Sequence, residues 1–126
     1  MRFLLLLIIS LITSTIFPQD FNRSDSLRGN LSSFRSCYDV SYYDLNLVID
    51  DKNKKIINSF NIIYLTAIDS FKSLQIDLFS NLNITSIEFD NEFLFFKRDH
   101  NAVFIDFPRV ILKGEMLSFT VYYNGK

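Results

Sequence analysis

Apolar and polar residues alternate with a period of two from Tyr38 onward, which is the pattern of half-buried β-strands. The first run places four apolar residues in one row: Tyr43, Leu45, Leu47 and Ile49. Val40 and Tyr42 lie in the opposite phase, and this slip of one residue predicts a β-bulge near Tyr42 and Tyr43. A polar turn over residues 50–55 then leads into the next run.

The second run, residues 56–67, is apolar on both faces. One face carries Phe60, Ile62 and Tyr64, and the other carries Ile57, Ile63 and Leu65. A strand with two apolar faces is covered on both sides or lies centrally in a sheet. We therefore expect this run to be the hairpin partner of the first strand and a central strand.

Five further short runs follow, separated by polar turns at 90–92, 98–101 and 113–115 among others. Four of them have inward apolar rows: Leu74, Ile76 and Leu78; Ile84, Ile87 and Phe89, with another phase slip; Val103, Ile105 and Phe107; and Leu117, Phe119, Val121 and Tyr123. The fifth is the short run FLFFK at 93–97. Pro108 is expected to end its strand, because proline cannot donate to a β-ladder.

The last run enters Asn124-Gly125, a dipeptide that favours hairpin turns because both central positions need a positive φ. Such a turn leads into a further strand, so we expect the domain to be incomplete at Lys126. About seven short strands without a convincing helix predict an all-β protein, an antiparallel β-sandwich of which the chain holds a part.

The N-terminal residues follow a different pattern. Residues 1–18 combine Arg2, an apolar stretch over 3–12 and a polar end, which is typical of a signal peptide and too short to span a bilayer. An uncleaved N-terminal anchor is the alternative. Residues 19–36 are polar and are predicted to be a linker, and residues 37–126 the folded part. The signal peptide predicts export to the periplasm, the medium or the cell surface.

Composition supports folding and excludes one class of partner. Of 126 residues, 16% are aromatic, which favours burial and suits a single domain. The 13 basic and 14 acidic residues nearly balance, so there is no electrostatic case for nucleic-acid binding. Cys37 is the single cysteine and cannot form an intramolecular disulfide. We expect it to be a small, partly buried hydrophobe at the start of the first strand.

Few residues offer chemistry. His100 is the single histidine, which is too few for a typical catalytic zinc site, and it is interpreted as a solvated turn residue. Asp50-Asp51 and Asp90 with Glu92 suit calcium binding or acid–base catalysis, but aspartate is also favoured in turns for backbone reasons, and we prefer the turn interpretation. The sequence has no glycine-rich phosphate loop and no G-x-S-x-G. We predict no catalytic, metal-binding or substrate-binding residue in this chain.

Four motifs follow one another in the folded part: Y-D-V-x-Y-Y-x-L-x-L over 38–47, L-Q-I-D-L over 74–78, I-x-x-I over 84–87 and V-x-Y-x-G over 121–125. Together, in this order and spacing, they resemble the N-terminal domain of the aminopeptidase N family, the gluzincin zinc metallopeptidases. The resemblance covers Cys37 to Lys126. It implies a saddle-like β-sandwich that precedes a catalytic domain.

The catalytic domain of that family carries H-E-x-x-H, a distant Glu ligand and G-x-M-E-N, and none of these motifs occurs here. The resemblance thus implies zinc and peptide substrates for a full-length parent, and packing of this domain on a missing catalytic domain. It assigns no cofactor to this chain. The chain is interpreted as the N-terminal fragment of an exported zinc-dependent aminopeptidase, with the fragment itself serving as scaffold.

Two alternatives stay open. Under the first alternative, the chain is a complete, exported β-sandwich binding module without catalysis. Under the second, it belongs to a parent that is homologous to the peptidases but has lost its metal site. An incomplete sandwich leaves an apolar edge and an inner face uncovered, and both favour association with other chains. We therefore expect residues 37–126 alone to be prone to aggregation.

Overall fold

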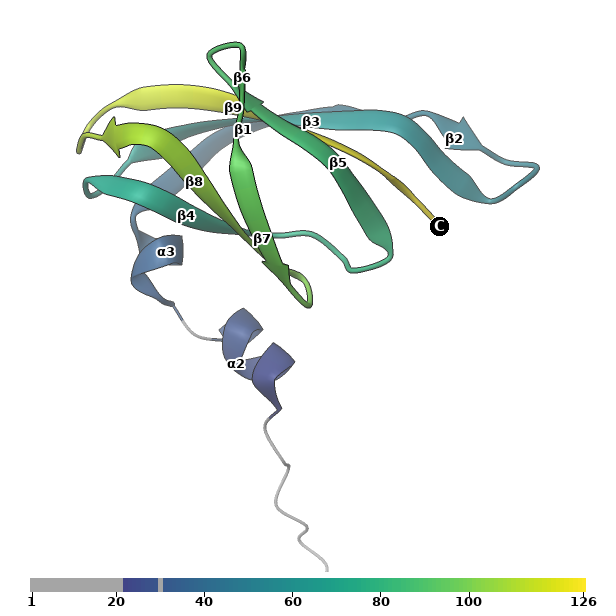
Figure 1. Cartoon of the computed structure of the whole chain (residues 1–126), viewed down its shortest axis with the longest axis horizontal. Helices are drawn as coiled ribbons and strands as arrows, with labels where there is room; N and C mark the ends of the chain where they lie inside the picture. The colour runs from purple at the N-terminus through teal and green to yellow at the C-terminus, as the bar shows by residue number, and fades with distance from the viewer. Residues whose placement is uncertain (1–21, 30) are drawn as a thin grey trace, which may run out of the picture.

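The computed structural model describes residues 22–29 and 31–126. Two short helices, α2 (Arg23–Gly29) and α3 (Ser33–Ser36), precede nine strands (Figure 1). The strands are β1 (Tyr38–Asn46), β2 (Ile49–Asp50), β3 (Lys55–Ala67), β4 (Phe71–Asp77), β5 (Leu82–Phe89), β6 (Glu92–Phe93), β7 (Phe95–Asp99), β8 (Ala102–Ile111) and β9 (Met116–Gly125).

The strands form two antiparallel sheets. The large sheet has the order β1-β3-β9-β5-β6, with β2 also paired to β3, and the small sheet has the order β4-β8-β7. Figure 1 shows the small sheet along one part of the large sheet, while the β2–β3 hairpin extends beyond it. The prediction of an all-β, sandwich-like domain is confirmed.

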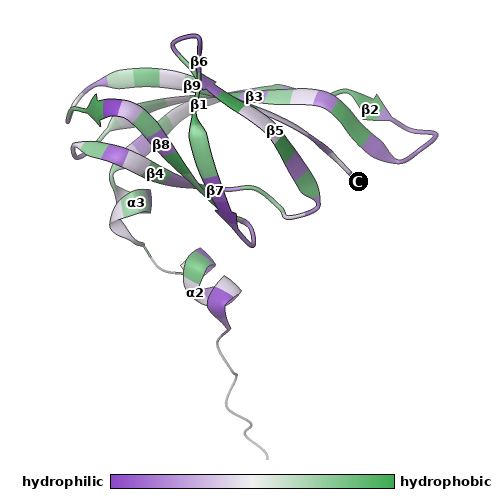
Figure 2. Cartoon of the chain, in the orientation of Figure 1, coloured by the Kyte–Doolittle hydropathy of each residue, from purple (hydrophilic) through white to green (hydrophobic). Residues whose placement is uncertain are grey.

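The core lies between the two sheets. Its largest fully buried side chains are Phe107, Phe119, Leu65, Leu74, Ile87, Ile105, Ile111 and Val103. Phe107 is central, because its ring meets those of Phe71, Phe89 and Phe119 edge to face at centroid distances of 5.7, 5.2 and 5.8 Å. In Figure 2 hydrophobic residues recur along the strands and hydrophilic residues mark several of the turns. The period-two pattern of the sequence therefore predicts which side chains face this core.

Several local predictions are confirmed. β3 lies between β1 and β9, as expected for a strand with two apolar faces. The register of β1 shifts between Val40 and Tyr42, and that of β5 between Ile84 and Ser86, where the sequence phase slips.

The acidic pairs lie at two hairpin turns, where Asp51 and Asp90 are turn residues as interpreted, whereas Asp50 ends β2 and Glu92 begins β6. Asp90 and Asn91 have φ values of 52° and 65°, which suits the turn that joins β5 to β6. The Asp50 carboxylate accepts hydrogen bonds from the Asn53 backbone N–H at 3.1 Å and from its amide Nδ2 at 2.7 Å. The Asp50 carboxylate therefore stabilises the backbone of its own turn.

The expected strand end at Pro108 is wrong. β8 continues to Ile111, and its pairing with β4 shifts register between Ser73–Asp106 and Phe71–Ile111. Pro108 lies inside this irregularity, where the ladder does not require its missing N–H.

Two runs that were each expected to be one strand are divided. FLFFK contributes to β6 in the large sheet and to β7 in the small sheet, with the buried Leu94 between them. The chain thus crosses from one sheet to the other at Leu94. The first run likewise divides into β1 and β2.

The predicted turn at Asn124-Gly125 is wrong. Gly125 continues β9 and pairs with Ile56 of β3 and Leu82 of β5, and neither residue of the dipeptide has a positive φ. A Cβ at Gly125 would lie 2.3 Å from the carbonyl oxygen of Asn81. This glycine therefore serves the close approach of a neighbouring backbone.

The sequence pattern indicated no convincing helix, whereas two short helices, α2 and α3, precede the strands. Asn22 caps α2, since its Oδ1 accepts the backbone N–H of Asp25 at 3.0 Å. Arg35 of α3 donates to the carbonyl oxygens of Leu27 and Arg28 at 3.0 and 2.8 Å, at the C-terminal end of α2. Polar side chains that suggested a linker thus cap and join two short helices.

The predicted signal peptide, residues 1–18, lies outside the described residues. Across residues 22–29 and 31–126, neither helix has the length and apolar character needed to cross a membrane.

Candidate functional site

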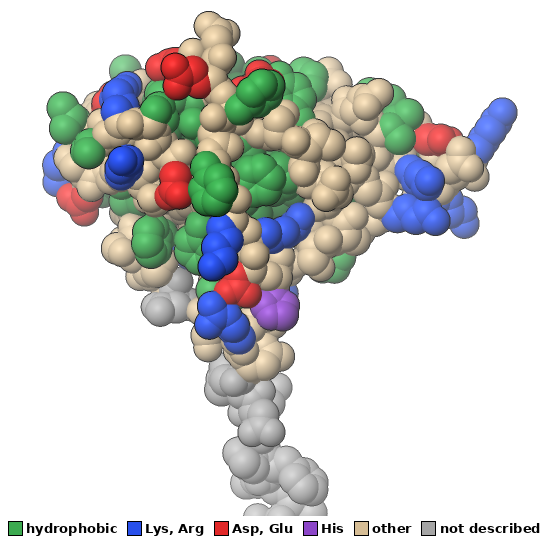
Figure 3. All heavy atoms as spheres, in the orientation of Figure 1, with side chains coloured by type: hydrophobic (Ala, Val, Ile, Leu, Met, Phe, Trp, Pro, Cys, Tyr) green, Lys and Arg blue, Asp and Glu red, His purple; other side chains and the backbone are tan. Residues whose placement is uncertain are grey.

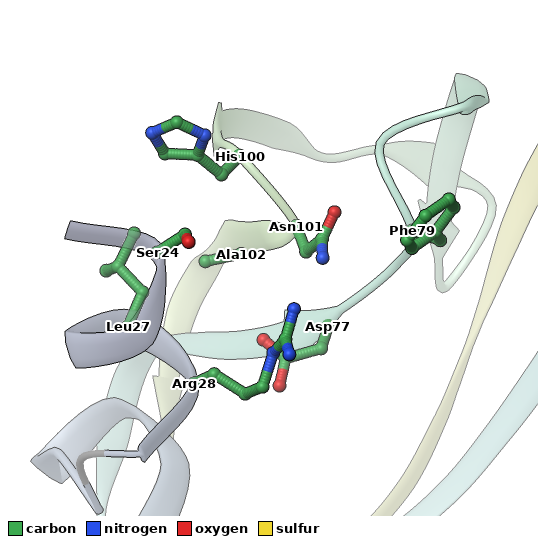
Figure 4. A pocket seen from close by; sticks show the side chains of 8 residues that line it. All are labelled: Ser24, Leu27, Arg28, Asp77, Phe79, His100, Asn101 and Ala102. Atoms are coloured by element: carbon green, nitrogen blue, oxygen red, sulfur yellow. The ribbon is translucent and has the colours of Figure 1, made fainter. Parts of the chain in front are cut away.

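A hollow of about 470 Å³ lies between α2 and one end of the small sheet (Figure 4). Small-molecule sites typically span about 300–1,000 Å³, so the hollow is large enough for a small ligand. It is lined by Ser24, Leu27, Arg28, Asp77, Phe79, His100, Asn101 and Ala102. We refer to it as the α2 hollow.

One wall of the α2 hollow is a single side of the helix. Ser24, Leu27 and Arg28 stand at positions i, i+3 and i+4, which bring side chains to the same helix face. Figure 4 shows the Arg28 side chain extending from α2 to the side of Asp77, at the end of β4. The helix therefore supplies both an apolar group and a cation to the hollow.

The opposite wall follows strand ends that Arg98 holds together. Its guanidinium donates to the carbonyl oxygens of Leu78 at 2.5 Å, Phe79 at 2.8 Å and Leu82 at 2.5 Å. Burial lowers the pKa of Arg98. These bonds fix the connection that carries Phe79, next to Asn101 in the β7–β8 turn.

Polar contacts attach α2 to the small sheet. Arg23 Nε donates to Asp99 Oδ2 at 2.8 Å, and this hydrogen bond lowers the pKa of the Asp99 carboxyl. Arg35 Nη2 lies 2.8 Å from Asp77 Oδ2. The buried Gln75 amide donates to Asp77 Oδ1 at 3.1 Å and more weakly to the Leu27 carbonyl at 3.4 Å.

Among the described residues, the side chains of the α2 hollow do not form the arrangement that nucleophilic catalysis needs. The Ser24 hydroxyl donates to Asn22 Oδ1 at 2.6 Å and so is not oriented by a base. His100 is a half-exposed turn residue with φ 54°, as predicted, and its Nε2 lies 3.9 Å from Asp99 Oδ1. Cys37 directly precedes β1, close to its predicted place, but it is fully buried and not partly buried; burial raises the pKa of its thiol, which makes it a poor nucleophile.

The donor set does not fit a zinc site. Within the described ranges, no three His, Cys, Asp or Glu side chains lie close enough together to hold a metal ion. The whole sequence has one histidine and one cysteine, whereas zinc sites draw their nitrogen and sulfur ligands from these residue types. No metal chemistry is therefore assigned to this chain.

Little in the sequence pattern predicted the α2 hollow. His100 lines it, but the acidic pairs lie elsewhere, at the hairpins β2–β3 and β5–β6. Arg28 belongs to a segment that was interpreted as a linker. Its place in the wall of the hollow depends on α2, and the apolar residues of that segment have no helical periodicity that would predict this helix. A polar residue within an apolar strand run, such as Gln75, was the one available signal that something covers the second face of β4.

A second feature is a partly open space between the large sheet and the end of β4, which we call the open cleft. This hollow of about 300 Å³ includes Tyr43 and Leu45 of β1, Asn61 of β3 and Val121 of β9. Tyr43 and Leu45 are 52% and 58% exposed. Asn61 Oδ1 is shielded from solvent, yet it has no hydrogen-bond donor among the described residues. An apolar surface with an unpaired acceptor is suited to be covered by further polypeptide.

Comparison with known proteins identifies the fold. No protein-family model matches the chain, and no curated protein matches its sequence significantly. Solved structures of M1 zinc metallopeptidases do match its architecture. One is a variant from Deinococcus radiodurans bound to a Tyr-Ser-Ala substrate, with a TM-score of 0.65, 18% identity and 73% of this chain covered.

Two further structures agree with the first. A two-domain M1 zinc metallopeptidase variant bound to L-arginine has a TM-score of 0.63 and 19% identity over 73% of this chain. The M1 zinc metallopeptidase from Deinococcus radiodurans has a TM-score of 0.64 and 18% identity over 72% of this chain. The match covers 21% of each of these chains. The likeness shows a shared fold, and this chain spans about a fifth of the length of these structures.

Proposed function

We propose that this chain is the N-terminal scaffold of an exported zinc-dependent aminopeptidase and that its own residues do not cleave peptides. The observation that carries the proposal is the two-sheet architecture, which aligns over 73% of the chain with M1 zinc metallopeptidases. The ordered motifs over residues 38–125 support the same family. The predicted signal peptide over 1–18 supports export.

Chemistry in the proposed parent comes from polypeptide beyond these residues. The matched structures are about five times longer than the aligned region, and the donor set of this chain does not fit zinc. The parent would bind zinc and peptide substrates, since two of the matched proteins hold a Tyr-Ser-Ala substrate and L-arginine. The open cleft offers an apolar surface for intramolecular packing of further parts of the parent.

Two measurements in the host organism test this proposal. The first reads the coding DNA past the codon for Lys126, where we expect an open frame with H-E-x-x-H. The second uses an antibody against residues 38–126 to isolate the native protein from the exported fraction. We expect a species much larger than 14.8 kDa that releases N-terminal residues from peptides. A chelator should abolish this activity, and added zinc should restore it.

Other outcomes would favour the alternatives. An inactive native species of about the mass of this chain would contradict the proposal and favour a free-standing β-sandwich binding module. A long frame without zinc ligands would instead indicate a parent that has lost its metal site. Recovery of the protein from the cytoplasm with its first 18 residues intact would contradict export.

A further inference from the structure

The α2 hollow contains a cation that has no partner carboxylate in the part of the chain that the structure describes. Asp77, the carboxylate that lines the hollow, already pairs with Arg35 at 2.8 Å, and Arg23 pairs with Asp99. Arg28 makes no ion pair with any carboxylate in residues 22–29 and 31–126. Figure 4 shows the Arg28 guanidinium beside Asp77, whose charge Arg35 already neutralises, so Arg28 keeps its positive charge without an ion-pair partner among the described residues.

A second polar group is held in place beside this cation. Asn101 Oδ1 accepts the backbone N–H of Ser80 at 2.8 Å, so the amide orientation is fixed by the connection that follows β4. The Asn101 amide nitrogen makes no hydrogen bond to the described residues and remains available as a donor. Arginine and amide donors together suit a carboxylate oxygen pair, because a guanidinium binds planar carboxylates in a bidentate manner.

The remaining wall is apolar. Leu27 of α2, Phe79 and Ala102 line the hollow, and the Phe79 side chain is 62% exposed. Arg98 holds the Phe79 backbone in place, so the point from which its largely exposed ring extends is fixed. A compact apolar group against Phe79 and Leu27 would remove this surface from water.

From these observations we infer that the α2 hollow binds a small carboxylate that carries a compact apolar group. Arg28 and the Asn101 amide hold the carboxylate, while Leu27 and Phe79 contact the apolar group. The inference rests on the charges and shape of the α2 hollow and does not depend on the proposed aminopeptidase function.

Calorimetric titration of the full chain with three probes tests the chemistry without any mutation. N-acetyl-L-leucine has the carboxylate and the apolar group, L-leucinamide lacks the carboxylate, and acetate lacks the apolar group. We expect N-acetyl-L-leucine to bind with a Kd of about 1 mM, as befits a ligand of this size. L-Leucinamide should not bind, and acetate should bind about tenfold or more weakly. Equal binding of the three probes, or no binding of N-acetyl-L-leucine, would overturn the inference.

Variants then locate the site. Arg28→Gln should weaken N-acetyl-L-leucine binding about tenfold to a hundredfold, because it removes a charge-assisted pair. Arg28→Lys should recover part of the affinity, since the charge returns without the planar fork. Lys72→Gln is the matched control, because it removes one exposed cation from β4 outside the hollow. Arg28 is on the surface, and far-ultraviolet circular dichroism should confirm unchanged folding. Unchanged affinity in a folded Arg28→Gln variant would place binding elsewhere and overturn the inference.

Discussion

The covered half of the sandwich and the open cleft use the same sequence pattern with opposite results. Val103, Ile105 and Phe107 alternate along β8 and are 0%, 0% and 1% exposed. Tyr43 and Leu45 alternate along β1 in the same way but are 52% and 58% exposed. The two rows differ in their surroundings, because the small sheet lies over part of the large sheet and leaves the β1–β2 end uncovered.

This difference separates two things that hydrophobic periodicity is often taken to predict together. A period of two determines which side chains share a face of a strand. Burial additionally requires a second layer, and residues elsewhere in the chain supply it. The β2–β3 hairpin has no second layer among the described residues, and Figure 3 shows positively charged side chains at its exposed tip. The lysines of this turn are Lys52, Lys54 and Lys55.

The largest expected effect is at the centre of the covered half. Phe107→Ala should lower the free energy of unfolding by about 4 kcal/mol, because it removes a buried ring and leaves a cavity among three other rings. Urea denaturation followed by circular dichroism measures this loss. Phe107→Leu, which leaves a smaller cavity, provides a usable variant if the alanine variant does not fold.

The matched change in the open cleft is Tyr43→Ala. It should cost less than about 1 kcal/mol, since half of that side chain already contacts water. Equal losses for Phe107→Ala and Tyr43→Ala would show that the open cleft is covered in solution, and would contradict the comparison.

The next effect concerns Tyr38, which links the two sheets. Its hydroxyl donates to the Gln75 carbonyl oxygen at 2.6 Å, and burial raises the pKa of Tyr38 to about 12. Because the folded state holds this proton more tightly, the stabilisation is complete below the unfolded pKa near 10 and is lost as pH rises to about 12. By pH 12 the loss should reach about 2 kcal/mol, because Tyr38 is then only half ionised in the folded state and its hydroxyl is partly screened by solvent.

Denaturation midpoints of the wild type and of Tyr38→Phe between pH 9 and 12 test this effect. The wild type should lose more stability across that window than the variant. Subtracting the two curves removes the contributions of Tyr122 and Tyr123, whose pKa values are also raised. Parallel curves would show that the Tyr38 hydroxyl is hydrated in the folded protein.

A smaller, local effect is expected at the open end of β9. In Gly125→Ala the new Cβ would meet the Asn81 carbonyl oxygen, so the strand end must shift. Because this is the end of the strand, we expect a loss of about 1 kcal/mol. Hydrogen exchange should be faster at the β5–β9 pair near Leu82 and unchanged in β8. Unchanged exchange at Leu82 would show that the strand end accommodates the methyl group.

Much of the fold was predictable, and the failures have physical reasons. The bulge before Tyr42 and the slip after Ile84 appear directly as changes of apolar phase. Asn124-Gly125 misled because a glycine suits a turn and a crowded strand equally well, and only the neighbouring strands decide between them. The α2 hollow was not predictable, since α2 is short and largely attached by polar contacts. Its orientation depends on Arg23, Arg35 and Gln75, which leave no periodic signal.

The smallest effect on stability should accompany a clear effect on association. Tyr43→Ser combined with Leu45→Ser should change the free energy of unfolding by less than about 1 kcal/mol, because both side chains are exposed in the open cleft. The wild-type chain should form higher oligomers as its concentration rises, because an uncovered apolar face favours contact between chains. Sedimentation velocity should show that the double variant remains monomeric to higher concentrations. A wild-type chain that stays monodisperse and unfolds cooperatively at all concentrations would mean that the open cleft needs no covering layer, and would weaken the proposal that further polypeptide packs there.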